Sequence, residues 1–244
     1  MFTIVKLNAI NSTNSYLKEW SLNNRGSNSL VVVAIEQTKG RGQQGVKWLS
    51  EKGKNLTFSL LYVPIDLSIS KQFYLNCAIS LGLYEALYPI IGKSLTIKWP
   101  NDIMSDSQKL GGILIENTVK SSIITKTIIG VGLNVNQINF PENLPHATSL
   151  KLIKEEDFDL EDLLNYILKS LEKYLKMLDN DLTNDLFRGY QKILFGRDKQ
   201  LKFKDANDTF SAVINGVNVK GQLLVTLKNG TVKTYNNKEV KFLL

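Results

Sequence analysis

Residues 95–135, LTIKWPNDIMSDSQKLGGILIENTVKSSIITKTIIGVGLNV, decide the fold of this 244-residue chain. Most of the stretch consists of apolar runs rich in β-branched residues, at 95–99, 109–117 and 122–135, and short polar turns separate them. Isoleucine, valine and threonine are enriched in strands because their branched side chains fit a pleated surface. The stretch therefore predicts consecutive strands.

The flanking segments predict further strands and several helices. Capping residues begin the segment STNSYLKEW, and Asp159 can cap a later helix whose leucines recur with a 3.6-residue period. These patterns predict an α+β domain. Strands are expected at 2–7, 30–36 and 55–63, and helices at 12–20, 73–87, 160–178 and about 181–193.

Beyond Gly196 the pattern changes to short alternating segments with turn signals, which predict a small β-barrel of about 50 residues. We therefore expect one domain over residues 1–194 and a second over 195–244. The second carries nine Lys or Arg and four Asp or Glu, against 21 and 19 in the rest of the chain. This surplus is typical of a solvated face, although it could also steer an acidic protein or nucleic acid.

The composition limits the kinds of site available. The chain has one cysteine, Cys77, expected in the core, and one histidine, His146, expected to be structural, so a zinc site of the usual Cys/His kind is excluded. No apolar run approaches the roughly 20 residues of a membrane span, and the N-terminus lacks a signal pattern. We therefore expect a cytoplasmic protein without membrane contact.

Residues 36–48, EQTKGRGQQGVKW, contain the spacing G-x-G-x-x-G of a dinucleotide-binding fingerprint. That fingerprint requires a following helix whose N-terminus binds the pyrophosphate, but a strand is expected there instead. Two interpretations stay open. The loop could close over an anionic ligand, with Arg41 as the cation and Trp48 as a stacking face, or it could be a surface loop without a ligand.

The segment 98–117, KWPNDIMSDSQKLGGILIEN, is the second candidate site. Pro100 ends a strand, and Asn101 and Asp102 present polar groups at its tip. Lys109 and two glycines then begin the next strand, where glycine lets a ligand approach the backbone closely. Together with the loop, this segment predicts a binding site.

In these residues the sequence resembles the biotin protein ligases, also called biotin–acetyl-CoA-carboxylase ligases. The resemblance implies a central mixed β-sheet with flanking helices, of the class II aminoacyl-tRNA synthetase-like (biotin–lipoate ligase) type, followed by a small C-terminal SH3-like β-barrel. It is carried, in the family's order, by STN (12–14), EQTKGRGQQGVKW (36–48), KWPND (98–102), KLGGILIE (109–116) and IGVGLNV (129–135).

The resemblance implies a two-step reaction. Biotin and ATP give biotinyl-5′-adenylate and pyrophosphate, and the biotinyl group then passes to a lysine of the biotin carboxyl carrier domain of a carboxylase. Negative charge builds on the phosphates, so cations aimed at it are the main catalytic resource. Mg²⁺ is expected to be held by the ATP phosphates and not by a protein cage. Family members are often dimers through the sheet edge, so a homodimer is also expected.

Motif positions carry the expected roles over to this chain. Asp102 is expected to orient or deprotonate the acceptor amine, because a free lysine has a pKa near 10.4. The catalytic residues are expected to be Arg41, Lys98, Asp102 and Lys109. The biotin site is expected to contain Ser12, Thr13, Asn14, Gln37, Arg41, Gly42, Gln43, Lys109, Gly112 and Leu114. The nucleotide site is expected to contain Arg41, Gln43, Trp48, Asn101, Lys109 and Asn134.

Two features depart from the family pattern. Gln43 stands where many relatives carry a second arginine, and we expect Lys39 or Lys47 to compensate, with some leakage of the adenylate. The motif STN begins at residue 12, which leaves no room before it for the DNA-binding domain of bifunctional members. The resemblance therefore implies a ligase without repressor function and without DNA binding.

Two other functions are compatible with parts of the sequence. A lipoate–protein ligase would also adenylate a carboxylate, but the combination of GRGQQG, KWPND and KLGGILIE favours biotin. A basic module for RNA or DNA is motivated by the pI of 9.3 and the β-rich tail. That module would need exposed aromatic residues for base stacking, and the tail's aromatic residues are explained as core and edge.

Overall fold

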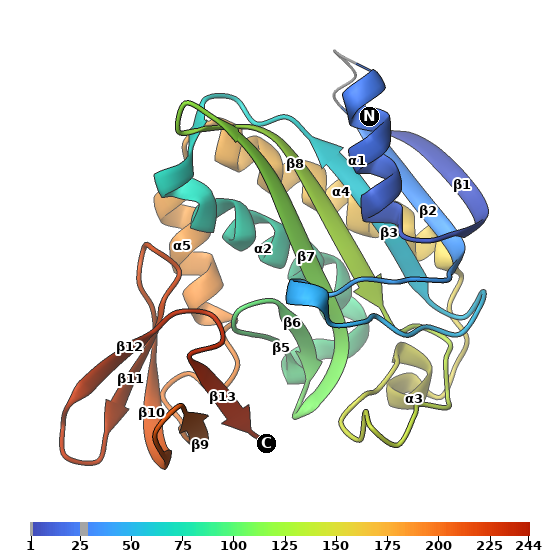
Figure 1. Cartoon of the computed structure of the whole chain (residues 1–244). Coiled ribbons are helices and arrows are strands. Elements are labelled where there is room, and N and C mark those ends of the chain that lie inside the picture. The colour runs from blue at the N-terminus through green and yellow to red at the C-terminus, as the bar shows by residue number, and fades with distance from the viewer. Residues whose placement is uncertain (1, 25–28) are drawn as a thin grey trace.

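The computed structural model describes residues 2–24 and 29–244, and in this part of the chain eight strands form a central sheet (Figure 1). The order is β1-β2-β3-β8-β7-β6-β5, with β4 paired to β8 outside this path. β1 and β2 are parallel, whereas the other pairs are antiparallel, so the predicted mixed sheet is confirmed. The strands are β1 Thr3–Ile10, β2 Leu30–Gln37, β3 Leu56–Tyr62, β4 Leu67–Ser68, β5 Leu95–Lys98, β6 Asp102–Ser105, β7 Gln108–Lys120 and β8 Ile123–Leu133.

Helices cover both faces of this sheet (Figure 1). α2 (Gln72–Ile91), α4 (Leu160–Asp179) and α5 (Thr183–Lys192) pack against one face and form the main core with it. α1 (Thr13–Asn23) lies on the opposite face, where its Leu17 packs with Leu30, Val32, Leu61 and Ile128.

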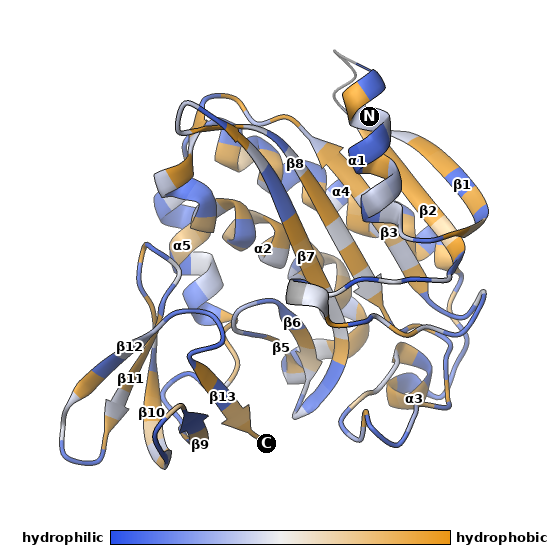
Figure 2. Cartoon of the chain, in the orientation of Figure 1, coloured by the Kyte–Doolittle hydropathy of each residue, from blue (hydrophilic) through white to orange (hydrophobic). Residues whose placement is uncertain are grey.

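β2 shows how the sequence encodes this layering. Val31 belongs to the main core, whereas its neighbours Leu30 and Val32 face α1. A strand covered on both faces has apolar residues at consecutive positions, and Figure 2 shows β2 as almost continuously hydrophobic.

α2 passes through the main core. Cys77 is fully buried on it, as expected. The segment Ile69–Ser94 is long and apolar enough to cross a membrane by length and composition, which the sequence analysis did not anticipate. Burial of Leu75, Ile79 and Leu83 against the sheet and α4 accounts for its apolar composition as core packing.

A second sheet of five antiparallel strands follows α5 in the described chain, in the order β12-β11-β10-β9-β13 (Figure 1). It matches the expected small SH3-like domain, and Phe203 lies at its centre between Phe210 and Phe242. Residues 193–199 lie between α5 and β9, and the domain boundary predicted at 194/195 falls within them. The strands are β9 Gln200–Asp205, β10 Thr209–Val217, β11 Leu223–Leu227, β12 Val232–Tyr235 and β13 Val240–Leu243.

The small sheet docks against the sheet edge that carries β5. Trp99 donates its indole N–H to the carbonyl of Gly221 at 2.8 Å, and the backbone of Ile97 bonds to both Ile193 and Phe195. The turn after β5 is therefore held from the second domain.

Several elements were not predicted from the sequence. β4, β6, β13 and α3 (Leu150–Lys154) have five residues or fewer, so they are too short to show a period. Among them, β6 begins at Asp102, which pairs with Lys98 at the end of β5, so Asp102 lies at a strand end as expected. α2 extends beyond its expected end at residue 87 to Ile91, and Pro89 falls in its last turn, where it removes one helical hydrogen bond.

Candidate functional site

The loop between β2 and β3 folds into a small hairpin over the sheet. Arg41 and Lys47 face each other in an antiparallel bridge, and the N–H of Gly42 donates to the carbonyl of Val46 at 2.7 Å. Trp48 returns to Gly40 through a 3.0 Å backbone hydrogen bond. A one-turn 3₁₀ helix, Gln43–Gly45, replaces the long helix that a dinucleotide fingerprint requires. The rejection of that fingerprint is therefore confirmed.

One end of the site is a hydrogen-bonded polar cluster at the start of α1. The backbone N–H and the hydroxyl of Thr13 both donate to Gln37 Oε1, at 2.8 and 3.1 Å. Asn14 donates from Nδ2 to Glu116 Oε2 at 2.7 Å, and its Oδ1 accepts from the Ser59 hydroxyl at 2.5 Å. Since Thr13, Asn14 and Ser59 are buried, their orientations are fixed before any ligand arrives.

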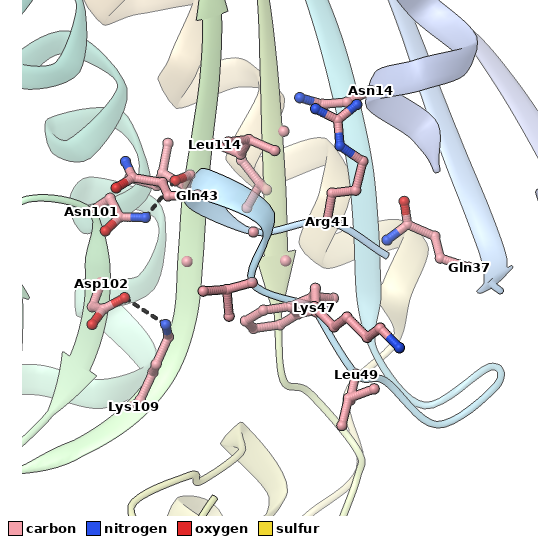
Figure 3. Close-up of a pocket in the computed structure, with 18 of the residues that line it drawn as sticks. Asn14, Gln37, Arg41, Gln43, Lys47, Leu49, Asn101, Asp102, Lys109 and Leu114 are labelled. Atoms are coloured by element: carbon pink, nitrogen blue, oxygen red, sulfur yellow. Dashed lines mark hydrogen bonds and ion pairs between the residues drawn. The ribbon is translucent and has the colours of Figure 1, made fainter. Parts of the chain in front are cut away.

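Arg41 lies beside this cluster, as Figure 3 shows. Its NH2 group is 2.8 Å from Glu116 Oε1, and its NH1 group donates to the Ser15 hydroxyl at 3.1 Å. The pair is partly exposed, so the ion pair stabilises the fold only slightly. Its main effect is to hold the guanidinium over the cavity with most of its charge neutralised.

The glycines of β8 make room for the site. A Cβ on Gly132 would lie 2.7 Å from Cζ2 of Trp48, and a Cβ on Gly130 would lie 3.0 Å from Cγ of Asn14. Only glycine therefore allows the indole and the amide to lie flat against the sheet at these two positions. This explains the motif IGVGLNV, to which the sequence analysis assigned a role only at Asn134.

The opposite end of the cavity is cationic. Asp102 accepts from Lys109 at 2.6 Å and from Lys98 at 2.8 Å, which leaves this group of three with a net positive charge. Burial raises the pKa of the Asp102 carboxyl, but the ammonium groups of Lys109 and Lys98 outweigh burial and hold that pKa below its usual range. The backbone of Lys109 bonds to His146 and Thr148, which fixes where its side chain starts.

Two buried polar atoms at this end have no hydrogen-bond partner in the described part of the chain. They are the indole Nε1 of Trp48, a donor, and Oδ1 of Asn134, an acceptor. Buried polar groups are almost always satisfied, so such atoms in a cavity indicate contacts that a ligand completes. Lys109 Nζ also lies 5.9 Å from the Trp48 ring centroid, next to any base stacked there.

These groups line one cavity of about 270 Å³ (Figure 3). Lys98 is the one expected site residue that does not line it, because it contacts the far side of Asp102. Of the two lysines expected to compensate for Gln43, Lys47 lines the cavity and Lys39 does not. The expected residues that do line it are Ser12, Thr13, Asn14, Gln37, Arg41, Gly42, Gln43, Trp48, Asn101, Asp102, Lys109, Gly112, Leu114 and Asn134.

The sequence analysis missed three polar residues of the site. Glu116 lies two residues beyond Leu114 on the same strand face as Gly112, so extending the two-residue alternation would have found it. Ser59 had no such signal within a buried strand. Lys238 lines the cavity from the second domain, and no pattern in the sequence brings it there.

Candidate metal ligands are sparse. Among residues 2–24 and 29–244, no group of three or more His, Cys, Asp or Glu side chains is placed to hold a metal ion. Asp102 is the one carboxylate among the cavity-lining residues of that part, and two lysines already engage it.

Comparisons with known proteins agree with this geometry. Residues 7–134 match the model of the Biotin/lipoate A/B protein ligase family. The chain is 30% identical over 237 residues to the bifunctional ligase/repressor BirA of Bacillus spizizenii, which covers 96% of this chain and 72% of that protein. It is 30% identical over 165 residues to the biotin–[acetyl-CoA-carboxylase] ligase of Mycobacterium tuberculosis, covering 66% of this chain and 59% of that one.

A solved structure is similar along its whole length. The biotin protein ligase from Aquifex aeolicus, in complex with biotin and ATP, aligns with a TM-score of 0.81 and 28% identity. The alignment covers 100% of this chain and 99% of that one.

Proposed function

Since this chain belongs to the biotin/lipoate A/B protein ligase family, we infer that it is an ATP-dependent biotin–protein ligase. It activates biotin as biotinyl-5′-AMP and then transfers the biotinyl group to a lysine of a biotin carboxyl carrier domain. The relatives named above, and the Aquifex aeolicus ligase that binds biotin and ATP, support this activity. Biotin and ATP are the substrates.

One observation carries the assignment: a single cavity joins a rigid polar end to a cationic and aromatic end. Thr13, Asn14 and Gln37 provide donors and acceptors for a ureido ring, while Gly112 and Leu114 line the stretch in between. At the other end Trp48 offers a stacking face, and Asn134 Oδ1 offers an acceptor for an exocyclic amine. Biotin and an adenine nucleotide fit end to end in such a cavity.

The first step follows from where the charges lie. The biotin carboxylate attacks the α-phosphorus of ATP, the bond between the α-phosphorus and the bridging oxygen breaks, and pyrophosphate leaves. Lys109 and Arg41 lie on the two sides of the cavity. Lys109 belongs to a cluster with a net positive charge, and the Arg41 guanidinium contributes mainly N–H donors, so both stabilise the oxygen atoms of the α-phosphate as negative charge develops. Binding both substrates in line also removes the entropy cost of their encounter.

In the second step the neutral amine of the acceptor lysine attacks the carbonyl carbon of the adenylate, AMP leaves with the electrons of the broken C–O bond, and the proton released from the nitrogen passes to water. Asp102 lies beside this centre, but its lowered pKa makes it a weak base. Of the two roles expected for Asp102, the geometry favours orientation: it holds Lys109 and is placed to accept a hydrogen bond from the incoming amine.

We also propose that Mg²⁺ binds together with ATP. Asp102 is occupied by two ammonium groups, so the residues lining the cavity fit a metal ion held mainly by phosphate oxygens and water. When bound, the ion neutralises phosphate charge. The protein's part is to hold the phosphates with Lys109 and to exclude water with the loop.

The acceptor protein, the oligomeric state and the cellular location are also proposals. The names of the relatives support a carrier domain of acetyl-CoA carboxylase or a related carboxylase. β1 is an edge strand of the catalytic sheet, which supports a homodimer formed through that edge. The use of ATP supports a cytoplasmic location. Mutual packing of Phe203, Phe210 and Phe242 leaves these rings unsuited to base stacking, which supports a protein that does not bind DNA through its basic tail.

The activity is tested by mass spectrometry of a biotin carboxyl carrier domain incubated with the chain, ATP, Mg²⁺ and biotin. We expect a biotinyl mass gain on one lysine that requires all four components. A parallel incubation with lipoate in place of biotin separates the two branches of the family. Exclusive lipoyl transfer would overturn the assignment to biotin.

Replacing Arg41 by Ala is expected to weaken biotin binding roughly five- to tenfold, because a hydrogen bond to a charged group contributes about 1.5–3 kcal/mol and partial exposure reduces it. Titration calorimetry with biotin measures the effect. Arg188→Ala is the matched control, since Arg188 also pairs with a carboxylate, Asp185, but lies on α5. An unchanged biotin affinity in Arg41→Ala would show that the loop does not contact biotin.

A further inference from the structure

Two of the four cationic side chains that line the cavity have no carboxylate partner among the described residues. Of the four that line it, Arg41 is paired with Glu116 and Lys109 with Asp102. Lys47 and Lys238 have no carboxylate within 4 Å among the described residues. ATP brings several negative charges into this space, and these two lysines add their charge to the net positive charge that Lys98, Asp102 and Lys109 already leave there.

Lys238 comes from the second domain. It lies in the turn between β12 and β13, with a left-handed backbone conformation (φ 72°) that few residues other than glycine adopt without strain. This turn is the one part of the small sheet that contributes a described residue to the cavity.

The neighbouring residue fastens the turn to the loop. Asn237 donates from Nδ2 to Oε1 of Gln43 at 2.9 Å, a contact between residues 194 positions apart. Gln43 begins the short 3₁₀ turn at the tip of the loop, and it lines the cavity as Lys238 does. An amide at position 43 can accept this hydrogen bond, whereas an arginine has no acceptor to offer.

We propose that the β12–β13 turn forms the outer wall of the nucleotide end, where Lys238 binds the phosphates of ATP and Asn237 holds the loop closed through Gln43. Gln43 and Lys238 then divide between them the two tasks of an arginine at position 43, which are anchoring the loop and supplying charge. This assignment replaces the expected compensation by Lys39 and leaves Lys47 as a second, independent cation on the loop. It rests on the proposed function, because ATP is its ligand.

The test compares Lys238→Met with Lys228→Met. Both variants lose one positive charge from the second domain, but Lys228 lies in the turn between β11 and β12 and does not line the cavity. Calorimetric titrations with ATP, adenosine and biotin are made on the full chain, and biotin-dependent exchange of pyrophosphate into ATP is followed in parallel.

We expect Lys238→Met to weaken ATP binding about five- to tenfold, to lower the salt dependence of that binding, and to leave adenosine and biotin affinities unchanged. Lys238→Arg should restore most of the ATP affinity. Lys228→Met should behave as the unaltered chain does. Equal ATP affinities in Lys238→Met and Lys228→Met would overturn the phosphate contact.

The hydrogen bond from Asn237 is tested by a double-mutant cycle with Asn237→Ala and Gln43→Ala, measured as the rate of biotinyl-5′-AMP release. Each single change should speed release about threefold, and the double change should add little to either, because both remove the same bond. Fully additive effects would show that the two residues do not act together.

Failure of the proposed function is distinguishable from failure of this inference. If the unaltered chain bound ATP but formed no biotinyl-5′-AMP, the ligase assignment would be wrong, while the ATP titrations would still decide the part played by Lys238.

Discussion

Replacing Lys109 by Met is expected to lower the rate of biotinyl-5′-AMP formation by about 10²–10³-fold, the usual consequence of losing one preorganised donor at a centre of developing charge. Lys109 is a cation that lines the cavity at the reacting end and is fixed there by several contacts. Its backbone bonds to His146 and Thr148, and its ammonium group lies 2.6 Å from Asp102. Biotin-dependent pyrophosphate exchange measures the loss.

Two further variants show whether the lost activity of Lys109→Met comes from the reaction itself or from a loss of folding. Lys173→Met is the matched control, because it also removes a lysine from a carboxylate pair, with Glu85, but on an exposed helix surface. Lys109→Arg keeps the charge and should retain part of the rate. A melting temperature close to that of the unaltered chain shows that the fold survives. Full exchange activity in Lys109→Met would remove Lys109 from the mechanism.

Replacing Gly132 by Ala is expected to weaken ATP binding roughly ten- to hundredfold, since overpacking a filled site costs about 1–3 kcal/mol. The new methyl group would lie 2.7 Å from Cζ2 of Trp48 and 2.8 Å from its Nε1. The indole must therefore leave the sheet surface, and its stacking face and its N–H donor move with it. Titration with ATP measures the loss.

A double-mutant cycle shows whether Gly132→Ala acts through Trp48. In a Trp48→Ala background, the added methyl group meets no indole, so Gly132→Ala should have little further effect on ATP affinity. Biotin affinity should change less than ATP affinity in both variants, because the polar end is built by Thr13, Asn14 and Gln37. If Gly132→Ala and Trp48→Ala weaken ATP binding additively, Gly132→Ala does not act through Trp48.

Most of the fold follows from local patterns. The β-branched runs predicted β1, β2, β3, β5, β7 and β8, and the 3.6-residue period together with the Asp159 cap predicted α4. Asp159 accepts from the backbone N–H groups of Glu161 and Asp162, as a capping side chain should. Short elements such as β6 were not predicted, because four residues contain too little pattern to distinguish a strand from a turn.

The candidate site was predictable to the extent that its residues lie in motifs. Thr13, Asn14, Arg41, Trp48 and Lys109 all line one cavity. What the motifs did not reveal is how these groups are paired. The contact between Arg41 and Glu116 and the sharing of Asp102 by two lysines join residues that no local pattern relates.

The sequence by itself determined the longer strands and helices and which chemical groups are available, because backbone conformation and side-chain period are local properties. The tertiary structure alone decided which groups meet: Trp48 over Gly132, Glu116 beside Arg41, and Lys238 at the nucleotide end. These contacts depend on strand order and on how the second domain docks. Both are set by burial of apolar surface between segments far apart in the chain, which no short stretch of sequence records.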